Sequence, residues 1–184
     1  CAEQFGGVVY PPVFFHAGFD RQCLVRLVTQ LFERLKATGF RVIIGVSGHN
    51  IQEQVDMINE ALSAVTADGK AAGIALWEVT LSQCEQSNTD HAGEWETSNM
   101  MFFSPDTVDI SELGHGPIWL DMSAPDGVGG LDPREHACAE VGRRNAELAA
   151  EAIGRKAREL LLSLPPQEQG FSLPSVSPEH WWAV

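Results

Sequence analysis

The sequence predicts an α/β fold with a mostly parallel sheet. Two apolar, β-branched runs alternate with two segments whose apolar residues recur every three or four positions. The links between these segments are short, which is typical of a right-handed βαβ arrangement. With 184 residues, the chain is long enough to bury roughly two-thirds of its unfolded surface, so a real core is expected.

The first three elements are expected between residues 7 and 46. Residues 7–15 form a β-branched and aromatic run that is strand-like until its proline pair. A helix is expected from Asp20 onward, because apolar side chains recur at helical spacing and Gly39 provides a stop. Residues 41–46 are almost wholly apolar, which is typical of a parallel strand covered on both faces.

The remaining elements follow the same logic. A second amphipathic helix is expected over about 51–65, and a second strand over 73–81. A short helix is expected over 93–103 and a long one over 134–162, separated by a Gly-, Pro- and Asp-rich connection of unusual length at 104–133.

The chain is expected to form one domain, residues 1–164, followed by a Pro- and Ser-rich tail, residues 165–184. The tail ends in Trp181 and Trp182, two large apolar side chains that we expect to dock on another surface.

Charge and cysteine content exclude several kinds of partner and compartment. Twelve Lys and Arg against twenty-five Asp and Glu give a net charge of −13, which argues against nucleic acid or an anionic membrane surface as partner. No apolar run approaches the roughly 18 residues of a membrane span. Four widely spread cysteines without a Cys-x-x-Cys motif favour reduced thiols and a cytoplasmic location.

The acidic residues are unevenly placed. From Ala71 to Pro133 there is no Lys or Arg, whereas eleven Asp and Glu fall in that window. The window is either a solvated acidic face or a carboxylate-rich site for divalent cations, and we expect the solvated face for most of its members.

His49 is the first candidate for chemistry. It follows the buried strand at 41–46 directly after Gly48, and ligands of parallel sheets bind beyond the carboxyl ends of the strands. Such a histidine is either a ligand or base, or a hydrogen-bonded structural group.

The segment from Asp90 to Ser98 is the second candidate. It holds one imidazole, His91, and three carboxylates within seven residues. If a helix begins near Gly93, Glu94 and Glu96 are about 200° apart, so only one of them can face a site. Alternatively, the acids only complement the positive helix terminus.

These segments carry a family resemblance. Gly39 to Ile44 followed by Ser47-Gly48-His49 resembles the GFR-hydrophobic-NGH segment of the creatininase (creatinine amidohydrolase) family. His91-Ala92-Gly93-Glu94-Trp95-Glu96-Thr97-Ser98 resembles its HAGExETS motif, and the similarity extends over about residues 5–163.

The resemblance implies a three-layer α/β/α sandwich and a metal-dependent amidohydrolase. It implies two divalent ions, zinc or manganese, that activate a water for attack on a small cyclic amide or amide-like substrate. By position, His49 resembles a ligand of one metal, Glu96 a ligand of the other, and His91 a group that assists proton transfer or substrate binding, while Glu94 would point outward. The family also implies a homo-oligomer, often a hexamer.

The departures from the family pattern keep two alternatives open. Ile51 stands where creatininase has a further glutamate ligand, and the N-terminal ligands Glu, His and Asp are not found, so residues 1–164 look incomplete at the N-terminus. A non-catalytic scaffold or assembly subunit is therefore one alternative. The other is an N-terminal nucleophile hydrolase that uses Cys1, although those folds have antiparallel sheets.

Overall fold

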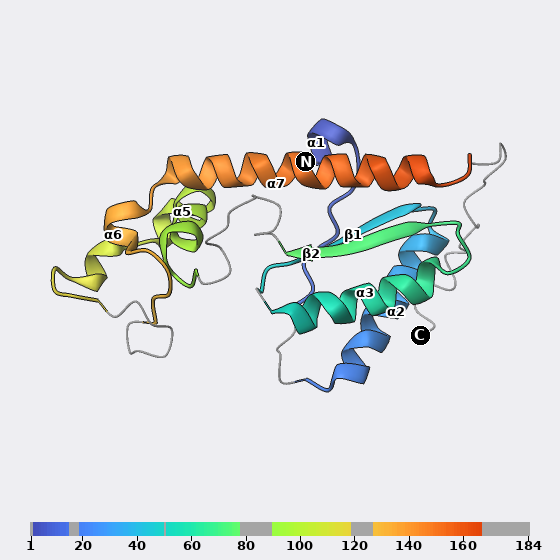
Figure 1. Cartoon of the computed structure of the whole chain (residues 1–184), viewed down its shortest axis with the longest axis horizontal. Helices are drawn as coiled ribbons and strands as arrows, with labels where there is room; N and C mark the ends of the chain where they lie inside the picture. The colour runs from blue at the N-terminus through green and yellow to red at the C-terminus, as the bar shows by residue number, and fades with distance from the viewer. Residues whose placement is uncertain (1, 15–18, 50, 78–89, 119–126, 167–184) are drawn as a thin grey trace, which may run out of the picture. The chain divides into compact units, whose positions relative to one another are not determined.

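A computed structural model of the chain describes residues 2–14, 19–49, 51–77, 90–118 and 127–166 (Figure 1). The chain divides into two compact units, and each is considered by itself. The sheet unit consists of residues 8–76 and 155–184, and the motif unit consists of residues 1–7 and 77–154. In the described part of the chain, no helix has the length and apolar character needed to cross a membrane.

The sheet unit begins with helix α2, Arg21–Ala37, as the sequence predicts. Asp20 caps its N-terminus, because the Asp20 side chain accepts a hydrogen bond of 2.8 Å from the backbone N–H of Cys23. Leu24, Val28 and Phe32 are buried along one side, which is the apolar stripe that the periodicity indicated.

Strands β1, Val42–Ser47, and β2, Ala72–Trp77, form a two-stranded parallel sheet, and helix α3, Gln52–Thr66, connects them. Helix α3 lies close to the sheet at two glycines. A Cβ at Gly45 would stand 2.8 Å from Ile58 Cγ2, and one at Gly73 would stand 2.7 Å from Leu62 Cδ2. The absence of side chains at these positions allows the close approach.

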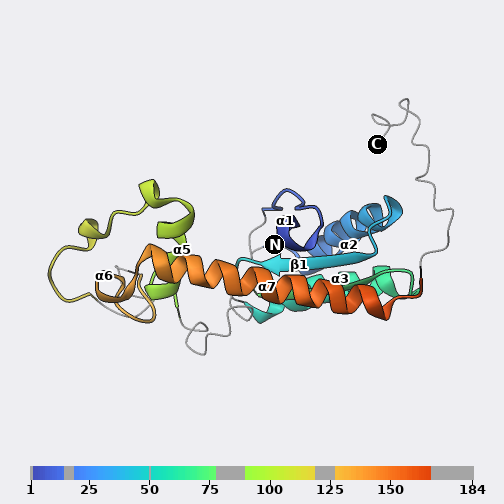
Figure 2. The same cartoon turned by 90° about the horizontal axis from the view of Figure 1, so that it is seen from above.

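The layers of the sheet unit have the order helix, sheet, helix. Helices α2 and α3 lie on one face of the two strands, and the Arg155–Ser163 part of helix α7 lies on the other (Figures 1 and 2). This is the three-layer α/β/α arrangement that the sequence resemblance implies. The covering is incomplete, however, since Val46 of β1 remains 46% exposed, contrary to the expectation of a strand buried on both faces.

The strand expected over residues 7–15 is wrong for the part that is described. Residues 7–14 have no regular secondary structure, and residue 15 lies outside the described residues. Val9 is 79% and Phe14 is 90% exposed. Pro11 and Pro12 have no backbone N–H to donate, so this segment can form few hydrogen bonds with a neighbouring strand.

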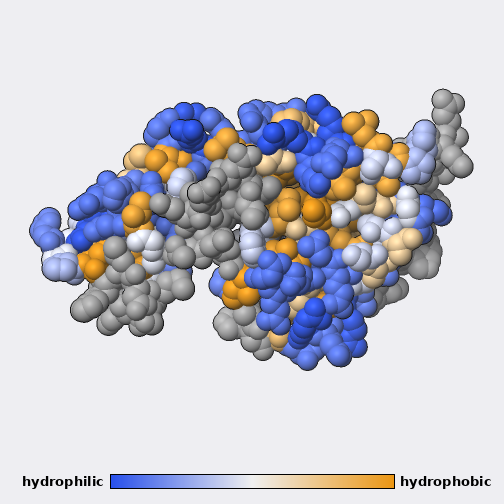
Figure 3. All heavy atoms as spheres, in the orientation of Figure 1, coloured by the Kyte–Doolittle hydropathy of each residue, from blue (hydrophilic) through white to orange (hydrophobic). Residues whose placement is uncertain are grey.

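Apolar residues also gather on the surface over β1 and β2 (Figure 3).

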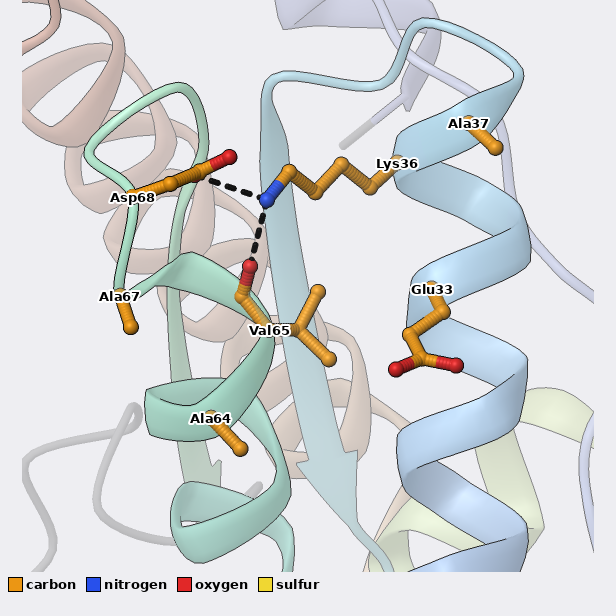
Figure 4. Close-up of a pocket in the computed structure, with 7 residues that line it drawn as sticks. All are labelled: Glu33, Lys36, Ala37, Ala64, Val65, Ala67 and Asp68. Carbon is orange, nitrogen blue, oxygen red and sulfur yellow. Dashed lines mark hydrogen bonds and ion pairs between the residues drawn. The ribbon is translucent and has the colours of Figure 1, made fainter.

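A cavity of about 470 Å³ lies between α2 and α3 (Figure 4). Lys36 Nζ donates 2.6 Å to the carbonyl oxygen of Val65 and 2.8 Å to the carboxylate of Asp68. The ammonium group of Lys36 lowers the pKa of Asp68 through this hydrogen bond. The cavity therefore contains a lysine that caps the end of α3, and none of the predicted site residues lines it.

The motif unit contains short helices and the first part of a long one. The helices are α1, Ala2–Phe5; α5, Glu94–Phe103; α6, Pro133–His136; and α7, Ala139–Ser163, which runs on into the sheet unit. The long connection holds two 3₁₀ turns, η2, Pro105–Thr107, and η3, Ile110–Leu113. Helix α5 confirms the helix expected over 93–103.

The single helix expected over 134–162 is wrong, because it is interrupted between α6 and α7. Ala137 is extended, with φ −79° and ψ 136°. The next residue, Cys138, donates its backbone N–H to Ser98 Oγ at 3.0 Å, a bond to a different helix. Gly142 then lies against the carbonyl of Ser98, where a Cβ would have no space. Packing on α5 thus overrides the helical periodicity.

The start of α6 is held by a partly buried ion pair. Asp132 accepts the backbone N–H of Arg134 at 2.9 Å, and its carboxylate is 2.6 Å from Arg134 Nη2. Arg134 Nη1 also donates to the carbonyl oxygens of Gly114 and Gly116, at 3.1 and 2.7 Å. The hydrogen bond from Arg134 lowers the pKa of Asp132, so the folded state favours the ionised carboxylate.

This ion pair makes stability depend on pH. Because the pKa of Asp132 is lowered on folding, its contribution is complete above the unfolded value of about 3.9 and is lost as the pH falls through the folded value. We expect Asp132→Asn to lower the free energy of unfolding at pH 7, and the difference from the natural sequence to shrink below about pH 4. Denaturant titrations at several pH values measure this.

Asp106→Asn is the control, since Asp106 is an exposed acid of the same unit. It should leave the free energy of unfolding within about 0.5 kcal/mol of the natural sequence. A difference for Asp132→Asn that stays constant from pH 7 to pH 2 would contradict the prediction.

Candidate metal site

His91 has a fixed backbone. It forms an isolated antiparallel bridge with Gly129, in which the His91 N–H donates 2.8 Å to the Gly129 carbonyl and the Gly129 N–H donates 2.7 Å in return. The glycine-rich segment after residue 126 therefore lies beside the start of the motif, although 38 residues separate the two in sequence.

The next two residues make a tight turn into α5. Ala92 has φ +50°, in the left-handed region that residues with a side chain rarely occupy. A Cβ on Gly93 would stand 2.5 Å from Asp90 Oδ1 and 2.5 Å from the carbonyl oxygen of Gly129. Position 93 therefore has space only for glycine, and the strained Ala92 is held by the surrounding structure.

Gly93 is the N-cap of α5 and has no side chain to accept the first helical N–H groups. Asp90 accepts them instead. One of its oxygens accepts the N–H of Trp95 at 3.2 Å, and the other accepts the N–H of Glu96 at 2.8 Å. The residue is only 9% exposed. Burial raises the pKa of Asp90, while the hydrogen bonds from Glu96 and Trp95 act in the opposite direction.

His91 and Glu96 are brought together at the surface of the motif unit. The distance from His91 Nδ1 to Glu96 Oε2 is 3.9 Å, and the side chains are 54% and 53% exposed. Glu96 Oε2 also accepts the N–H of Ala92 at 2.8 Å, which turns the carboxylate back toward the loop. The exposure of the two carboxylates is the reverse of what we expected. Glu94, expected to point outward, is partly buried, and Glu96, expected to face a site, is exposed.

His49 lies in the sheet unit, directly beyond the carboxyl end of β1, and is exposed. Its carbonyl oxygen accepts hydrogen bonds from Ser47 Oγ at 2.8 Å and from the Ile51 N–H at 2.8 Å. These two hydrogen bonds fix the backbone of His49 just beyond the carboxyl end of β1, the region where ligands of parallel sheets bind.

The donor atoms of His91 and Glu96 are of the kinds that bind divalent metals, but they are too few to form a complete ligand group. Imidazole nitrogen and carboxylate oxygen are ligands of zinc and manganese, and the exposed pair of His91 and Glu96 can be reached from solvent. In the described parts of the chain, however, no three His, Cys, Asp or Glu side chains stand together as a ligand group. Glu96 therefore fits as one ligand of an incomplete coordination shell, with the imidazole of His91 beside it.

Two further side chains of this segment were not assigned a role from sequence. Asp90 is a buried acceptor, and its position ahead of a helix with a glycine N-cap is the signal that could have identified it. The indole Nε1 of Trp95 is buried and finds no acceptor among the described residues.

Comparison with known proteins decides the family. The family model for creatininase, described as creatinine amidohydrolase, matches residues 17–162. The chain belongs to the creatininase family. The family consists of metal-dependent amidohydrolases, and the match includes both His49 and the motif from His91 to Ser98.

Solved creatininase structures share the fold. A mutant creatininase of Zn-Zn type is 20% identical, with a TM-score of 0.60, over 90% of this chain and 72% of that one. A further creatinine amidohydrolase (creatininase) is 18% identical, with a TM-score of 0.61, over 88% of this chain and 70% of that one. A protein from Bacteroides fragilis NCTC 9343, provisionally described as a creatinine amidohydrolase, is 24% identical with a TM-score of 0.57; 77% of this chain covers 62% of it. No curated protein sequence matches the chain.

The turn of this creatininase-family motif depends on Gly93. We expect Gly93→Ala to lower the free energy of unfolding by about 1–3 kcal/mol, because its Cβ would overlap Asp90 and the Gly129 backbone. Gly116→Ala is the matched control in the same unit, since a Cβ there meets nothing within 4 Å. Denaturant unfolding measures both, and equal effects of the two variants would contradict the prediction.

Proposed function

We propose that this chain is a divalent-metal amidohydrolase that hydrolyses a C–N bond of a small cyclic amide or amide-like substrate. The observation that carries the proposal is the pairing of His91 with Glu96 in a chain of the creatininase family. Two divalent ions per complete site, zinc or manganese, would supply an activated water and polarise the substrate carbonyl. The Zn-Zn type of a similar creatininase favours zinc.

Each predicted residue has a distinct role in this proposal. Glu96 is a ligand of one ion, and the N–H of Ala92 holds one of its oxygens so that the carboxylate has a fixed orientation. His49, beyond the end of β1, is a ligand of the other ion. His91 accepts and returns a proton during hydrolysis, because an imidazole can serve as both general base and general acid. The distance from His91 Nδ1 to Glu96 Oε2 is 3.9 Å, which is too long for a hydrogen bond between the two side chains.

The partners follow from the same proposal. The substrate is a small molecule, and the net charge of −13 disfavours nucleic acid and anionic membranes. We propose a cytoplasmic homo-oligomer, a hexamer by family resemblance. Exposed apolar side chains such as Val9 and Phe14 support an oligomer, since such surface is usually covered by a partner. The domain boundary at residue 164 and the docking of Trp181 and Trp182 stay predictions; both tryptophans lie outside the described residues.

Substitutions of the three residues test the roles. We expect Glu96→Ala and His49→Ala each to remove one metal ion and most of the activity, because each deletes a ligand. We expect His91→Ala to keep both ions and to lower the turnover rate by roughly 10²- to 10⁴-fold. Metal analysis of the purified protein, combined with hydrolysis assays on creatinine and other cyclic amides, measures these effects.

The matched control is Glu94→Ala, which deletes the other carboxylate of the same helical turn. It should keep both ions. If Glu96→Ala also kept both ions, the assignment of Glu96 as a ligand would be wrong.

A second candidate function is a non-catalytic scaffold or assembly subunit. Two observations favour it: Ile51 cannot ligate a metal, and no complete ligand group is present within the described residues. Metal analysis separates the two functions. Two tightly bound divalent ions per complete unit exclude the scaffold, and a protein without metal excludes the enzyme. The N-terminal nucleophile alternative rests on Cys1, which lies outside the described residues, and the parallel sheet argues against it.

A further inference from the structure

The carboxylate of Asp90 occupies an unusual place for a helix cap. The ordinary capping position is the N-cap, which here is Gly93, whereas Asp90 precedes it by three residues. Even so, the two Asp90 oxygens accept the N–H groups of the second and third residues of α5, at 3.2 and 2.8 Å. The chain must fold back on itself to make these bonds.

The other sides of this carboxylate are closed by glycine backbone. A Cβ on Gly93 would stand 2.5 Å from Asp90 Oδ1, and a Cβ on Gly130 would stand 3.0 Å from the same oxygen. Gly130 has φ +98°, a conformation suited to glycine alone. With an exposed fraction of 9%, Asp90 has little freedom to move away from the two N–H groups.

The same contacts link both members of the candidate pair. Glu96 donates its N–H directly to Asp90, and His91 follows Asp90 in the chain and is bridged to Gly129. Between them, Ala92 keeps its left-handed φ of +50° and donates its N–H to Glu96 Oε2. One buried carboxylate therefore fixes the backbone on both sides of the His91 and Glu96 side chains.

We infer that Asp90 is a positioning residue of this site: it holds His91 and Glu96 in one fixed arrangement without itself binding metal or substrate. Its two oxygens each accept a backbone N–H, and burial leaves the carboxylate only 9% exposed, so it faces the helix end and not the solvent. The inference rests on the proposed function in one respect, namely that the fixed arrangement of His91 and Glu96 serves metal binding and hydrolysis. Groups that orient ligands from behind commonly affect metal affinity by 10- to 100-fold.

The central variant is Asp90→Asn, which keeps the size of the side chain but has only one acceptor oxygen. The amide NH₂ then faces one of the two helical N–H groups, so one bond is lost. The control is Asp109→Asn, because Asp109 also accepts a backbone N–H, from Ser111, at the start of η3 in the same unit. This control changes a capping carboxylate into an amide in the same way, without contacting residues 90–96.

Two measurements are made on the full chain. The first is Zn²⁺ affinity by competition with a chelator, where we expect Asp90→Asn to bind about 10- to 100-fold more weakly and Asp109→Asn to bind as the natural sequence does. The second needs no metal: amide hydrogen exchange by NMR, together with the line widths of the His91 ring signals. We expect the Trp95 and Glu96 amides to be protected in the natural sequence, and to exchange at least tenfold faster in Asp90→Asn, with a broadened His91 ring.

The outcomes separate this inference from the proposed function. If the natural sequence binds Zn²⁺ and Asp90→Asn binds it equally well, the positioning role is overturned and the function stands. If the natural sequence binds neither Zn²⁺ nor Mn²⁺, the proposed function fails, and the exchange rates and His91 line widths still decide whether Asp90 fixes the pair. If Asp90→Asn does not fold, the natural sequence decides: unprotected Trp95 and Glu96 amides overturn the inference, and protected ones support it.

Discussion

The start of α5 imposes the main constraint on the motif unit. The first N–H groups of any helix need acceptors, and a glycine N-cap provides none from its side chain. Asp90 meets the need only if the chain turns back sharply between the two. That turn requires the left-handed Ala92, a side-chain-free position at 93, and the close approach of the Gly129–Gly130 backbone. The placement of His91 and Glu96 is a consequence of how this helix is capped.

The same need explains much of the acidic window between residues 71 and 133. Among the acids of this window that the structure describes, Asp90 caps α5, Asp109 caps η3 and Asp132 caps α6. From sequence, all but Glu96 were expected to form a solvated acidic face. The carboxylates of Asp90 and Asp132 are instead mostly buried, because each accepts N–H groups at the start of a short helix.

The elements that could be predicted from sequence are those set by local periodicity. Helices α2 and α3 and the strands β1 and β2 follow their apolar patterns, and the family motifs identified His91, Glu96 and His49 as candidates. Helix α5 has the expected bounds, although Ser98 is its one buried residue. The break at Ala137 was missed because it depends on a hydrogen bond from Cys138 to Ser98, 40 residues earlier. The predicted strand does not form over residues 7–14, because a strand needs a neighbouring strand as well as a suitable apolar pattern. Asp90 was missed for a similar reason, since its burial depends on Gly130.

Charge gives Asp90 a second effect on the candidate site. The N-terminus of a helix carries a partial positive charge of about half a unit, which opposes the binding of a cation to side chains of the first turn. Glu96 lies in that first turn. The buried carboxylate of Asp90, in contact with the same N–H groups, offsets this positive charge from behind. No Lys or Arg occurs in the sequence between residues 71 and 133 to pair with Glu96 from within the window. For the proposed function, this means that the Glu96 carboxylate, held by Ala92 and beside an imidazole, has no cationic side chain of the window as a competitor for a divalent ion.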